Sequence, residues 1–233
     1  MIEQVADGVV RVSLAPLASL NCYVLDDVLV DAGARWSARR ILRALRGRDI
    51  RAHALTHAHP DHQGSSREIC RRLDVPLWCG EADRAVTESG ELQLQFRNPE
   101  GMIARLQAML VGGPGHPVDR VLQEGDQLGD FTVLQTPGHT AGHLSFWRPQ
   151  DRLLVIGDAA LSMNPLTTRR GLREPPELFT RHPERNRASL RKLAVLGPET
   201  ICFGHGPVLH DGAAYQDFVA RLPPRAPYEW TEA

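Results

Sequence analysis

Several features that mark particular classes of protein are scarce in this sequence. Lys192 is the only lysine, so arginine supplies nearly all of the positive charge, and the formal net charge is −1. This balance argues against general nucleic-acid binding. The four cysteines form no CxxC pair, and a reduced, cytoplasmic protein is the default expectation. No run of about eighteen apolar residues occurs, so we expect no membrane-spanning helix, and the first residues lack the basic start and apolar core of a signal peptide.

The length and the remaining composition are those of an ordinary globular protein. The chain has 233 residues, of which 42% are hydrophobic and 24% are charged. A chain of this length can bury a large core within one domain. We therefore predict a single domain over residues 1–222, followed by a loose C-terminal tail over residues 223–233.

Histidine, in contrast, is concentrated in one place. The segment His57-Ala58-His59-Pro60-Asp61-His62 follows an apolar stretch, residues 52–56, that predicts a strand. Extended backbone directs residues i and i+2 to the same side, so His57 and His59 can converge on one point. Asp61 and His62 lie where the chain turns toward a helix and can reach a second point nearby. Neutral imidazole and carboxylate suit borderline cations such as zinc, so the motif predicts a metal site rather than a polar loop.

Three later motifs supply further donors. His139 lies in a Thr-Pro-Gly-His segment, Asp158 ends an apolar run, and His205 lies between two glycines. In this order the motifs resemble those of the metallo-β-lactamase superfamily, and within it the glyoxalase II-like metallo-hydrolases. The resemblance extends from the first strands to His205. It implies an α/β fold, a four-layer αββα sandwich of two mixed sheets.

The same resemblance implies a ligand set and a chemistry. One metal is expected on His57, His59 and His139, and a second on Asp61, His62 and His205, with Asp158 bridging them. The cofactors are then two divalent ions, with zinc expected first and iron or manganese as alternatives. A hydroxide between two cations would be the nucleophile, and Asp61 would orient it as the catalytic residue. Asp31 is expected to hold loop backbone or to orient a ligand, and His143 to be structural.

Departures from the family patterns narrow the substrate. Asp158 disfavours the true β-lactamases, which carry cysteine here or lack the bridging aspartate. Leu161 stands where acyl-homoserine lactonases have tyrosine, and too few residues follow His205 to hold the whole glutathione-binding region of glyoxalase II. We therefore expect a small-molecule acyl substrate, an ester, thioester or lactone. Its anionic handle would contact an arginine-rich segment at Arg169, Arg170 and Arg173, although a solvated helix face explains that segment equally.

Three other functions stay open at this point. An RNA-processing nuclease shares the same ligands but needs a basic channel, which the modest arginine excess hardly supplies. A mononuclear iron persulfide dioxygenase uses part of the ligand set, and metal analysis would distinguish it. A non-catalytic metal-bearing protein that binds a signal is the third. The sequence leaves the oligomeric state undetermined.

Two segments are harder to interpret. In residues 81–120, Met102, Leu106, Met109 and Leu110 recur at helical spacing. Such a face packs more often into a core than around a substrate, with a lid over the site as the alternative. Residues 162–182 have few apolar residues and three prolines, which predicts a long loop.

Overall fold

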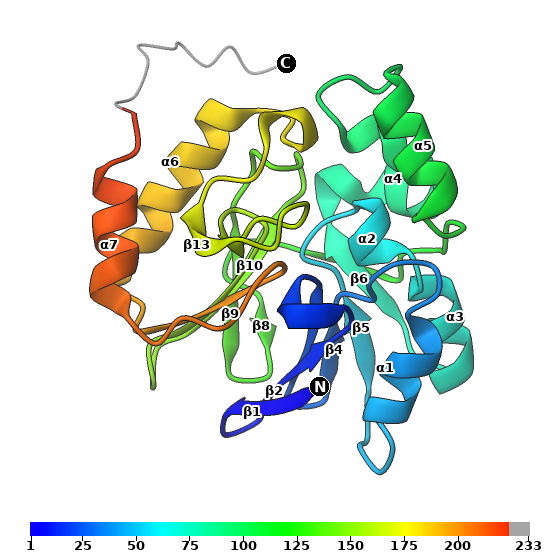
Figure 1. The fold of residues 1–233 in the computed structure, drawn as a ribbon. Coiled ribbons are helices and arrows are strands. Elements are labelled where there is room, and N and C mark those ends of the chain that lie inside the picture. The colour runs from blue at the N-terminus through cyan, green and yellow to red at the C-terminus, as the bar shows by residue number, and fades with distance from the viewer. Residues whose placement is uncertain (224–233) are drawn as a thin grey trace.

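Two mixed β-sheets pack face to face, and helices cover both outer faces (Figure 1). This is the predicted four-layer αββα sandwich, seen here in a computed structural model that describes residues 1–223. The predicted loose tail, residues 223–233, lies outside the described residues except for residue 223. Within residues 1–223, no helix is both long and apolar enough to cross a membrane.

The first sheet has seven strands in the order in which they occur along the chain. Its strands are β1 (Ile2–Ala6), β2 (Val9–Ser13), β3 (Asn21–Leu25), β4 (Val28–Val30), β5 (Ala52–Ala54), β6 (Leu77–Gly80) and β7 (Arg120–Leu122). Neighbours from β1 to β4 are antiparallel, joined by short turns, whereas those from β4 to β7 are parallel. Parallel neighbours need long crossover connections, and these carry the helices and the histidine motif.

The second sheet has five strands in the order β14-β11-β10-β9-β8. Its strands are β8 (Gln127–Leu128), β9 (Phe131–Gln135), β10 (Leu144–Arg148), β11 (Leu153–Gly157) and β14 (Thr200–Phe203). The pair of β11 and β14 is parallel, and the other pairs are antiparallel. His139, Asp158 and His205 each follow a strand of this sheet, so the sheet presents all three along one edge.

Helices separate into groups by the sheet that they cover. The α-helices are α1 (Ala38–Ala44), α2 (Pro60–Gln63), α3 (Ser66–Leu73), α4 (Arg84–Ser89), α5 (Met102–Leu110), α6 (Pro183–Ala194) and α7 (Gly212–Ala220), with short 3-10 helices η1 (Pro16–Ala18), η2 (Glu81–Asp83), η3 (Leu92–Gln95) and η4 (Glu177–Phe179). Apolar residues of α1 and α3 pack on the first sheet, and those of α6 and α7 pack on the second. Helices α4 and α5 stand together at one edge of the molecule (Figure 1).

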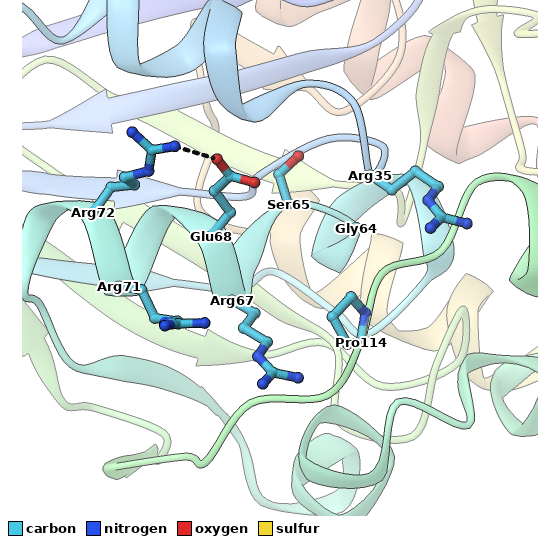
Figure 2. Close-up of a pocket in the computed structure, with 8 residues that line it drawn as sticks. All are labelled: Arg35, Gly64, Ser65, Arg67, Glu68, Arg71, Arg72 and Pro114. Atoms are coloured by element: carbon cyan, nitrogen blue, oxygen red, sulfur yellow. Dashed lines mark ion pairs between the residues drawn. The ribbon is translucent and has the colours of Figure 1, made fainter.

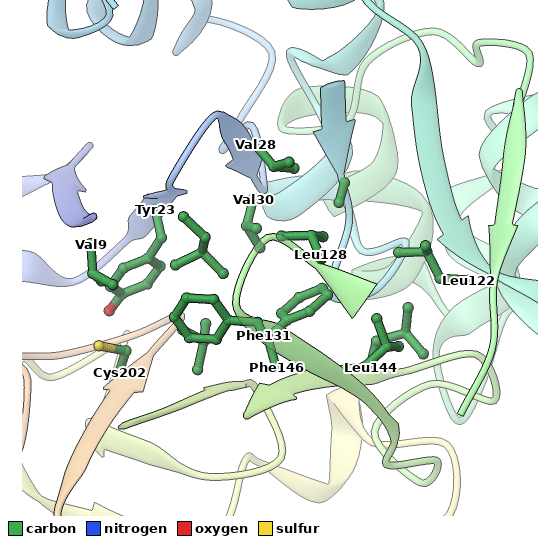
Figure 3. Packing of buried hydrophobic residues seen from close by; sticks show 14 of the residues in the cluster. Val9, Tyr23, Val28, Val30, Leu122, Leu128, Phe131, Leu144, Phe146 and Cys202 are labelled. Carbon is green, nitrogen blue, oxygen red and sulfur yellow. The ribbon is translucent and has the colours of Figure 1, made fainter. Parts of the chain in front are cut away.

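The main core lies between the two sheets (Figure 3). The inner strands β3 and β4 of the first sheet are buried on both faces. Tyr23 and Leu25 point to the other sheet, whereas Val24 between them points to the helices. Phe131 and Phe146 from the second sheet are fully buried in the same core. Each such side chain contributes about 1.5–3 kcal/mol by leaving water. This core holds the two sheets, and therefore their loops, in a fixed relation.

Two expectations from the sequence are wrong. Residues 162–182 are not one long loop, because β12 (Leu161–Met163) and β13 (Arg170–Arg173) pair as a small antiparallel sheet. The hairpin is held by backbone bonds, which the sparse apolar residues of β13 do not reveal. The apolar face of α5 is not in the core either: Met102 is 80% exposed and Met109 63%.

Candidate metal centre

The histidine motif begins in the turn after β5 and continues into the first turn of α2. His59 has extended backbone, with φ −88° and ψ 157°, and immediately precedes the helix. Pro60 opens α2, as proline does well because its fixed φ suits the first helical turn. Asp61 and His62 therefore point from the first turn of a helix while His57 and His59 point from extended chain.

The structure brings all seven predicted metal-binding residues together. Donor atoms of His57, His59 and His139 lie within 4.8 Å of one another, and so do those of Asp61, His62 and His205. A third overlapping group of donors joins Asp158 to His57 and His62. The first two groups are those that the family resemblance implies.

Asp158 lies between the two groups. Its Oδ2 is 3.1 Å from Nε2 of His205, 3.5 Å from Nε2 of His62 and 3.8 Å from Nε2 of His139. One carboxylate oxygen thus faces imidazoles from both groups. This is the position that a bridging carboxylate requires.

Hydrogen bonds fix the orientation of four of the imidazoles through their Nδ1 atoms. His57 contacts the hydroxyl of Thr56 at 2.9 Å, His62 donates to Asp31 at 2.9 Å, and His139 contacts the hydroxyl of Thr180 at 3.2 Å. His205 donates in the same way to the carbonyl of Ser19. When Nδ1 carries the proton, Nε2 keeps its lone pair free for a cation.

The opposite nitrogens of His57, His62 and His139 have no hydrogen-bond partner, whereas Nε2 of His205 faces carboxylate oxygens of Asp61 at 3.2 Å and Asp158 at 3.1 Å. Among the described residues, the buried atoms without one include Nε2 of His57, His59, His62 and His139, together with Oδ1 of Asp158. Buried polar atoms are nearly always paired, so several orphans that face one another need an explanation. A divalent cation supplies it, because imidazole nitrogens and carboxylate oxygens are the ligands that zinc and similar ions prefer. The residues present therefore fit two metal ions.

The charges in the cluster agree with this. Burial lowers the pKa of His57, His59 and His139, that of His59 to about 4, so these rings are neutral at pH 7. Burial opposes charge on His205 as well, but Asp158 and Asp61 raise the pKa of its ring to about 10.

The two carboxylates are held ionised. Burial raises the pKa of both Asp61 and Asp158, but the imidazoles of His205 and His62 outweigh it and lower both values below the ordinary range. Burial would lower the pKa of His62, but Asp158 and Asp31 outweigh it and hold the pKa of this ring above its ordinary value. This corner of the cluster thus strongly favours positive charge.

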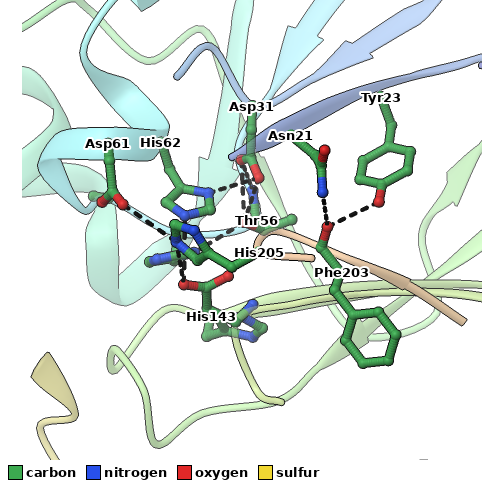
Figure 4. Close-up of polar contacts among 12 residues, drawn as sticks. Asn21, Tyr23, Asp31, Thr56, Asp61, His62, His143, Phe203 and His205 are labelled. Carbon is green, nitrogen blue, oxygen red and sulfur yellow. Dashed lines mark hydrogen bonds and ion pairs between the residues drawn. The ribbon is translucent and has the colours of Figure 1, made fainter. Parts of the chain in front are cut away.

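Asp31 and His143 support the cluster from outside it (Figure 4). Asp31 accepts hydrogen bonds from the backbone N–H of Thr56 at 2.8 Å and from the ring of His62 at 2.9 Å. His143 accepts the backbone N–H of Asp158 at 3.1 Å through Nε2, and its Nδ1 contacts Thr136 at 2.8 Å. These contacts confirm the expectation that Asp31 holds loop backbone and orients a ligand, and that His143 is structural.

Asp83 also supports the cluster from outside it, and the sequence analysis did not predict this role. It is fully buried in η2. Its carboxylate accepts from the backbone N–H of Ala58 and of Gly142, and from the side chains of Thr140 and Gln95, at 2.8–2.9 Å. Burial raises the pKa of Asp83, and these four donors oppose the rise. The residue ties the first histidine loop to the loop of His139; an acid in a short helix gives no sequence signal of that kind.

Close packing behind the cluster excludes any side chain at Gly204. A Cβ atom there would lie 2.1 Å from Oδ1 of Asp158 and 2.7 Å from Cε1 of His62. The strand β14 is anchored nearby, since Asn21 and Tyr23 both donate to the carbonyl of Phe203 (Figure 4). The glycine is thus required for the approach of the last histidine loop.

A small cavity of about 60 Å³ opens beside the cluster. His59, Asp61, His139, Asp158 and His205 form its base, and its other walls include Phe96, Gln107, Leu161, Leu166 and Phe179. The predicted substrate arginines, Arg169, Arg170 and Arg173, are not among its lining residues. The guanidinium of Arg173 instead donates to the carbonyls of Arg169, Arg170 and Gly171 in its own hairpin. Contact between these arginines and an anionic end of the substrate stays a prediction.

The fold and the cluster together define a metallo-hydrolase type of site, and comparison with known proteins identifies the family. The model of the metallo-beta-lactamase superfamily matches residues 17–205, so the chain belongs to that superfamily. A probable metallo-hydrolase of Bacillus subtilis, YflN, is 32% identical over 200 residues, which cover 77% of this chain and 75% of YflN. A hydroxyacylglutathione hydrolase of Cereibacter sphaeroides is 30% identical over 194 residues, which cover 80% of this chain and 60% of that enzyme.

Solved structures agree on the fold. The protein TTHA1623, crystallised in a di-iron-bound form, has a TM-score of 0.66 and 30% identity, covering 92% of this chain and 98% of that one. The metallo-beta-lactamase superfamily protein ST1585 from Sulfolobus tokodaii has a TM-score of 0.70 at 19% identity, covering 97% and 90%. At that identity the second likeness shows the fold alone.

Proposed function

We propose that this protein is a dinuclear metal-dependent hydrolase, glyoxalase II-like in its ligand set, that cleaves an ester, thioester or lactone bond in a small acyl substrate. The observation that carries the proposal is the set of buried, unpartnered Nε2 atoms that converge around Asp158. Under this proposal, His57, His59 and His139 would hold one ion, Asp61, His62 and His205 would hold the other, and Asp158 would serve both. We propose zinc as the metal, with iron as the alternative because TTHA1623 was crystallised in a di-iron-bound form.

Two cations in this place would supply Lewis-acid charge to a substrate carbonyl and would make a water molecule more acidic. The chain's own residues do the rest. Asp61 lines the cavity, and its lowered pKa keeps it ionised at neutral pH, so it can orient a water toward the substrate. The cavity wall opposite is apolar, with Phe96 and Phe179 in edge contact at 5.7 Å between ring centroids. It excludes bulk water from the reacting bond.

The test combines metal content with turnover. We expect about two metal ions per chain, and hydrolysis of at least one member of a panel of esters, thioesters and lactones. His139→Ala and Asp158→Asn, made separately, should each abolish hydrolysis while the circular dichroism spectrum is unchanged. Asp217→Asn, at an exposed carboxylate on α7, is the control and should leave turnover as it is.

Two outcomes would defeat the proposal. Turnover that survives in Asp158→Asn would show that the cluster is not where the reaction occurs. About one iron per chain, with uptake of dioxygen in place of hydrolysis, would favour the persulfide oxygenase instead.

A further inference from the structure

The cavity at the metal centre is too small for most acyl substrates. A volume of about 60 Å³ has room for roughly four water molecules, which is enough for a reacting carbonyl group and a few neighbouring atoms. The remainder of a larger substrate must lie outside, along whatever surface adjoins the mouth. The chemistry of that surface therefore selects the substrate.

The surface that adjoins the mouth is one side of α5. Gln107 lines the cavity, and helical spacing places Ile103, four residues earlier, and Leu110, three residues later, on the same side of the helix. Next around the helix come Leu106 and Met102. These four residues and Met109 together form a surface that we call the apolar arc. The exposed fractions of its side chains are 80% for Met102, 47% for Ile103, 47% for Leu106, 63% for Met109 and 52% for Leu110. Only the opposite side, with Ala104, is buried.

The side of the cavity mouth that faces α5 is apolar as well. Leu166, in the turn between β12 and β13, lines the cavity and is 73% exposed, and Leu178 in η4 is 44% exposed. The rings of Phe96 and Phe179 form part of the apolar cavity wall. An apolar surface of this extent usually marks a binding site.

Few charged side chains lie at this mouth. Apart from the metal-binding residues, no residue that lines the cavity is charged, and Gln107 alone is polar. The nearby Arg97 pairs with Glu177 at 2.9 Å, and Arg105 on α5 pairs with Glu100. Arg35 differs from these two: it donates to the backbone carbonyl of Met109, at the end of α5, at 3.1 Å.

We infer that the apolar arc of α5 and the facing Leu166 bind the alkyl chain of a medium-chain or long-chain acyl substrate whose carbonyl group lies in the cavity. The inference rests on the proposed hydrolase function. The apolar arc is continuous with the cavity, because α5 contributes Gln107 to the cavity and the arc to the adjoining surface. An alkyl chain that leaves the cavity therefore lies directly on the arc. Methionine side chains are flexible and adapt to chains of different length.

A series of N-acetylcysteamine thioesters tests this, with acetyl, butanoyl, hexanoyl and octanoyl groups. Full burial of one methylene corresponds to about a fourfold gain in affinity. Because the arc is an open surface, we expect kcat/KM to rise about twofold per added methylene. The double variant Ile103→Gln with Leu110→Gln should lower kcat/KM for the octanoyl thioester about tenfold and kcat/KM for the acetyl thioester less than twofold. Val195→Gln, at an exposed apolar residue at the end of α6, is the matched control and should change neither.

A second readout does not need turnover. N-acetyl-S-octylcysteamine is a thioether that cannot be hydrolysed, and calorimetry measures its binding. We expect the double variant to bind it about tenfold more weakly than the wild type and Val195→Gln to bind it equally well.

The outcomes separate the inference from the function beneath it. Equal kcat/KM for acetyl and octanoyl thioesters would overturn the inference and leave the hydrolase intact. No hydrolysis of any panel member, with thioether binding still weakened in the double variant, would reject the hydrolase and leave the alkyl site. A wild-type dimer that the double variant converts to monomer, or binding to phosphatidylcholine vesicles that it abolishes, would assign the face to another partner and overturn the inference.

Discussion

Two cavities of this protein differ in almost every respect. The one beside the metal cluster is small, and the unpartnered atoms at its base are buried. The other, of about 570 Å³, lies outside the turn between α2 and α3 and is lined by Arg35, Arg67, Arg71 and Arg72 (Figure 2). It is nearly tenfold larger, and its arginines are exposed.

The larger cavity lacks the feature that marks the smaller one. Arg72 pairs with Glu68 at 3.3 Å, and Arg35 donates to a backbone carbonyl at 3.1 Å. Its one buried hydroxyl, that of Ser65, donates to the carbonyl of Ala34 and accepts the N–H of Ala38. None of its lining residues has a buried polar atom without a partner. Buried atoms that lack partners, rather than volume or charge, therefore distinguish the functional cavity.

The largest effect is expected where the packing behind the metal cluster is closest. In Gly204→Ala the added methyl group must displace Asp158 or His62, so we expect less than two metals per chain and a loss of activity of about 100-fold or more. Elemental analysis and turnover measure both. Retention of full metal content and activity would show that the cluster tolerates a shift of its central carboxylate.

A large loss of stability is expected for Asp83→Ala. The change leaves four donors, from the two histidine loops and η3, without an acceptor. This should lower the free energy of unfolding by about 3–5 kcal/mol and Tm by roughly 10 °C. Urea denaturation and a thermal scan measure these. Asp217→Ala on α7 is the control, and an equal effect there would remove the special role of Asp83.

An intermediate effect depends on pH. His53, fully buried under α3, contacts the carbonyl of Leu29 and the hydroxyl of Ser66, and burial lowers the pKa of its ring from 6.5 to about 4. Between these values the unfolded chain binds a proton that the folded protein does not. The free energy of unfolding should therefore fall as the pH drops below about 6.5, by about 3 kcal/mol near pH 4 from this group.

His53→Gln removes that contribution. The variant should be less stable than the wild type at neutral pH but should lose less stability on acidification, as urea unfolding at about pH 7 and about pH 4.5 measures. Parallel losses in both proteins would mean that His53 is not the group that titrates.

The smallest effect is expected at the arginine-lined cavity. Arg67→Gln with Arg71→Gln alters two exposed side chains outside the metal cluster, so kcat/KM should change less than twofold and stability less than about 0.5 kcal/mol. A larger loss of activity, specific to anionic substrates, would place the charged end of the substrate in the arginine-lined cavity. It would contradict the conclusion that only the cavity beside the metal cluster serves the reaction.

The metal cluster was predictable because its donors occur in short local motifs. His57 to His62 converge through the switch from strand to helix, and His139, Asp158 and His205 each follow a strand, so the sequence indicates both the donor and its place at a strand end. The layered fold followed from the same motifs through the family resemblance.

The supports and the walls of the site were not predictable in this way. Asp83 acts through loops that are distant in sequence, and nothing near it indicates that it is buried. Helical spacing correctly grouped Met102, Leu106 and Met109 on one face of α5, but periodicity cannot tell whether a face meets the core or solvent. Apolar wall residues such as Phe96 are indistinguishable in sequence from core residues.

Titration of the metal-free protein with zinc, followed by calorimetry and elemental analysis, tests the central claim most directly. The account predicts about two ions bound per chain, falling to fewer in Asp158→Asn and unchanged in Arg67→Gln with Arg71→Gln. A chain that binds no ion, or that binds the same number after Asp158→Asn, would contradict it.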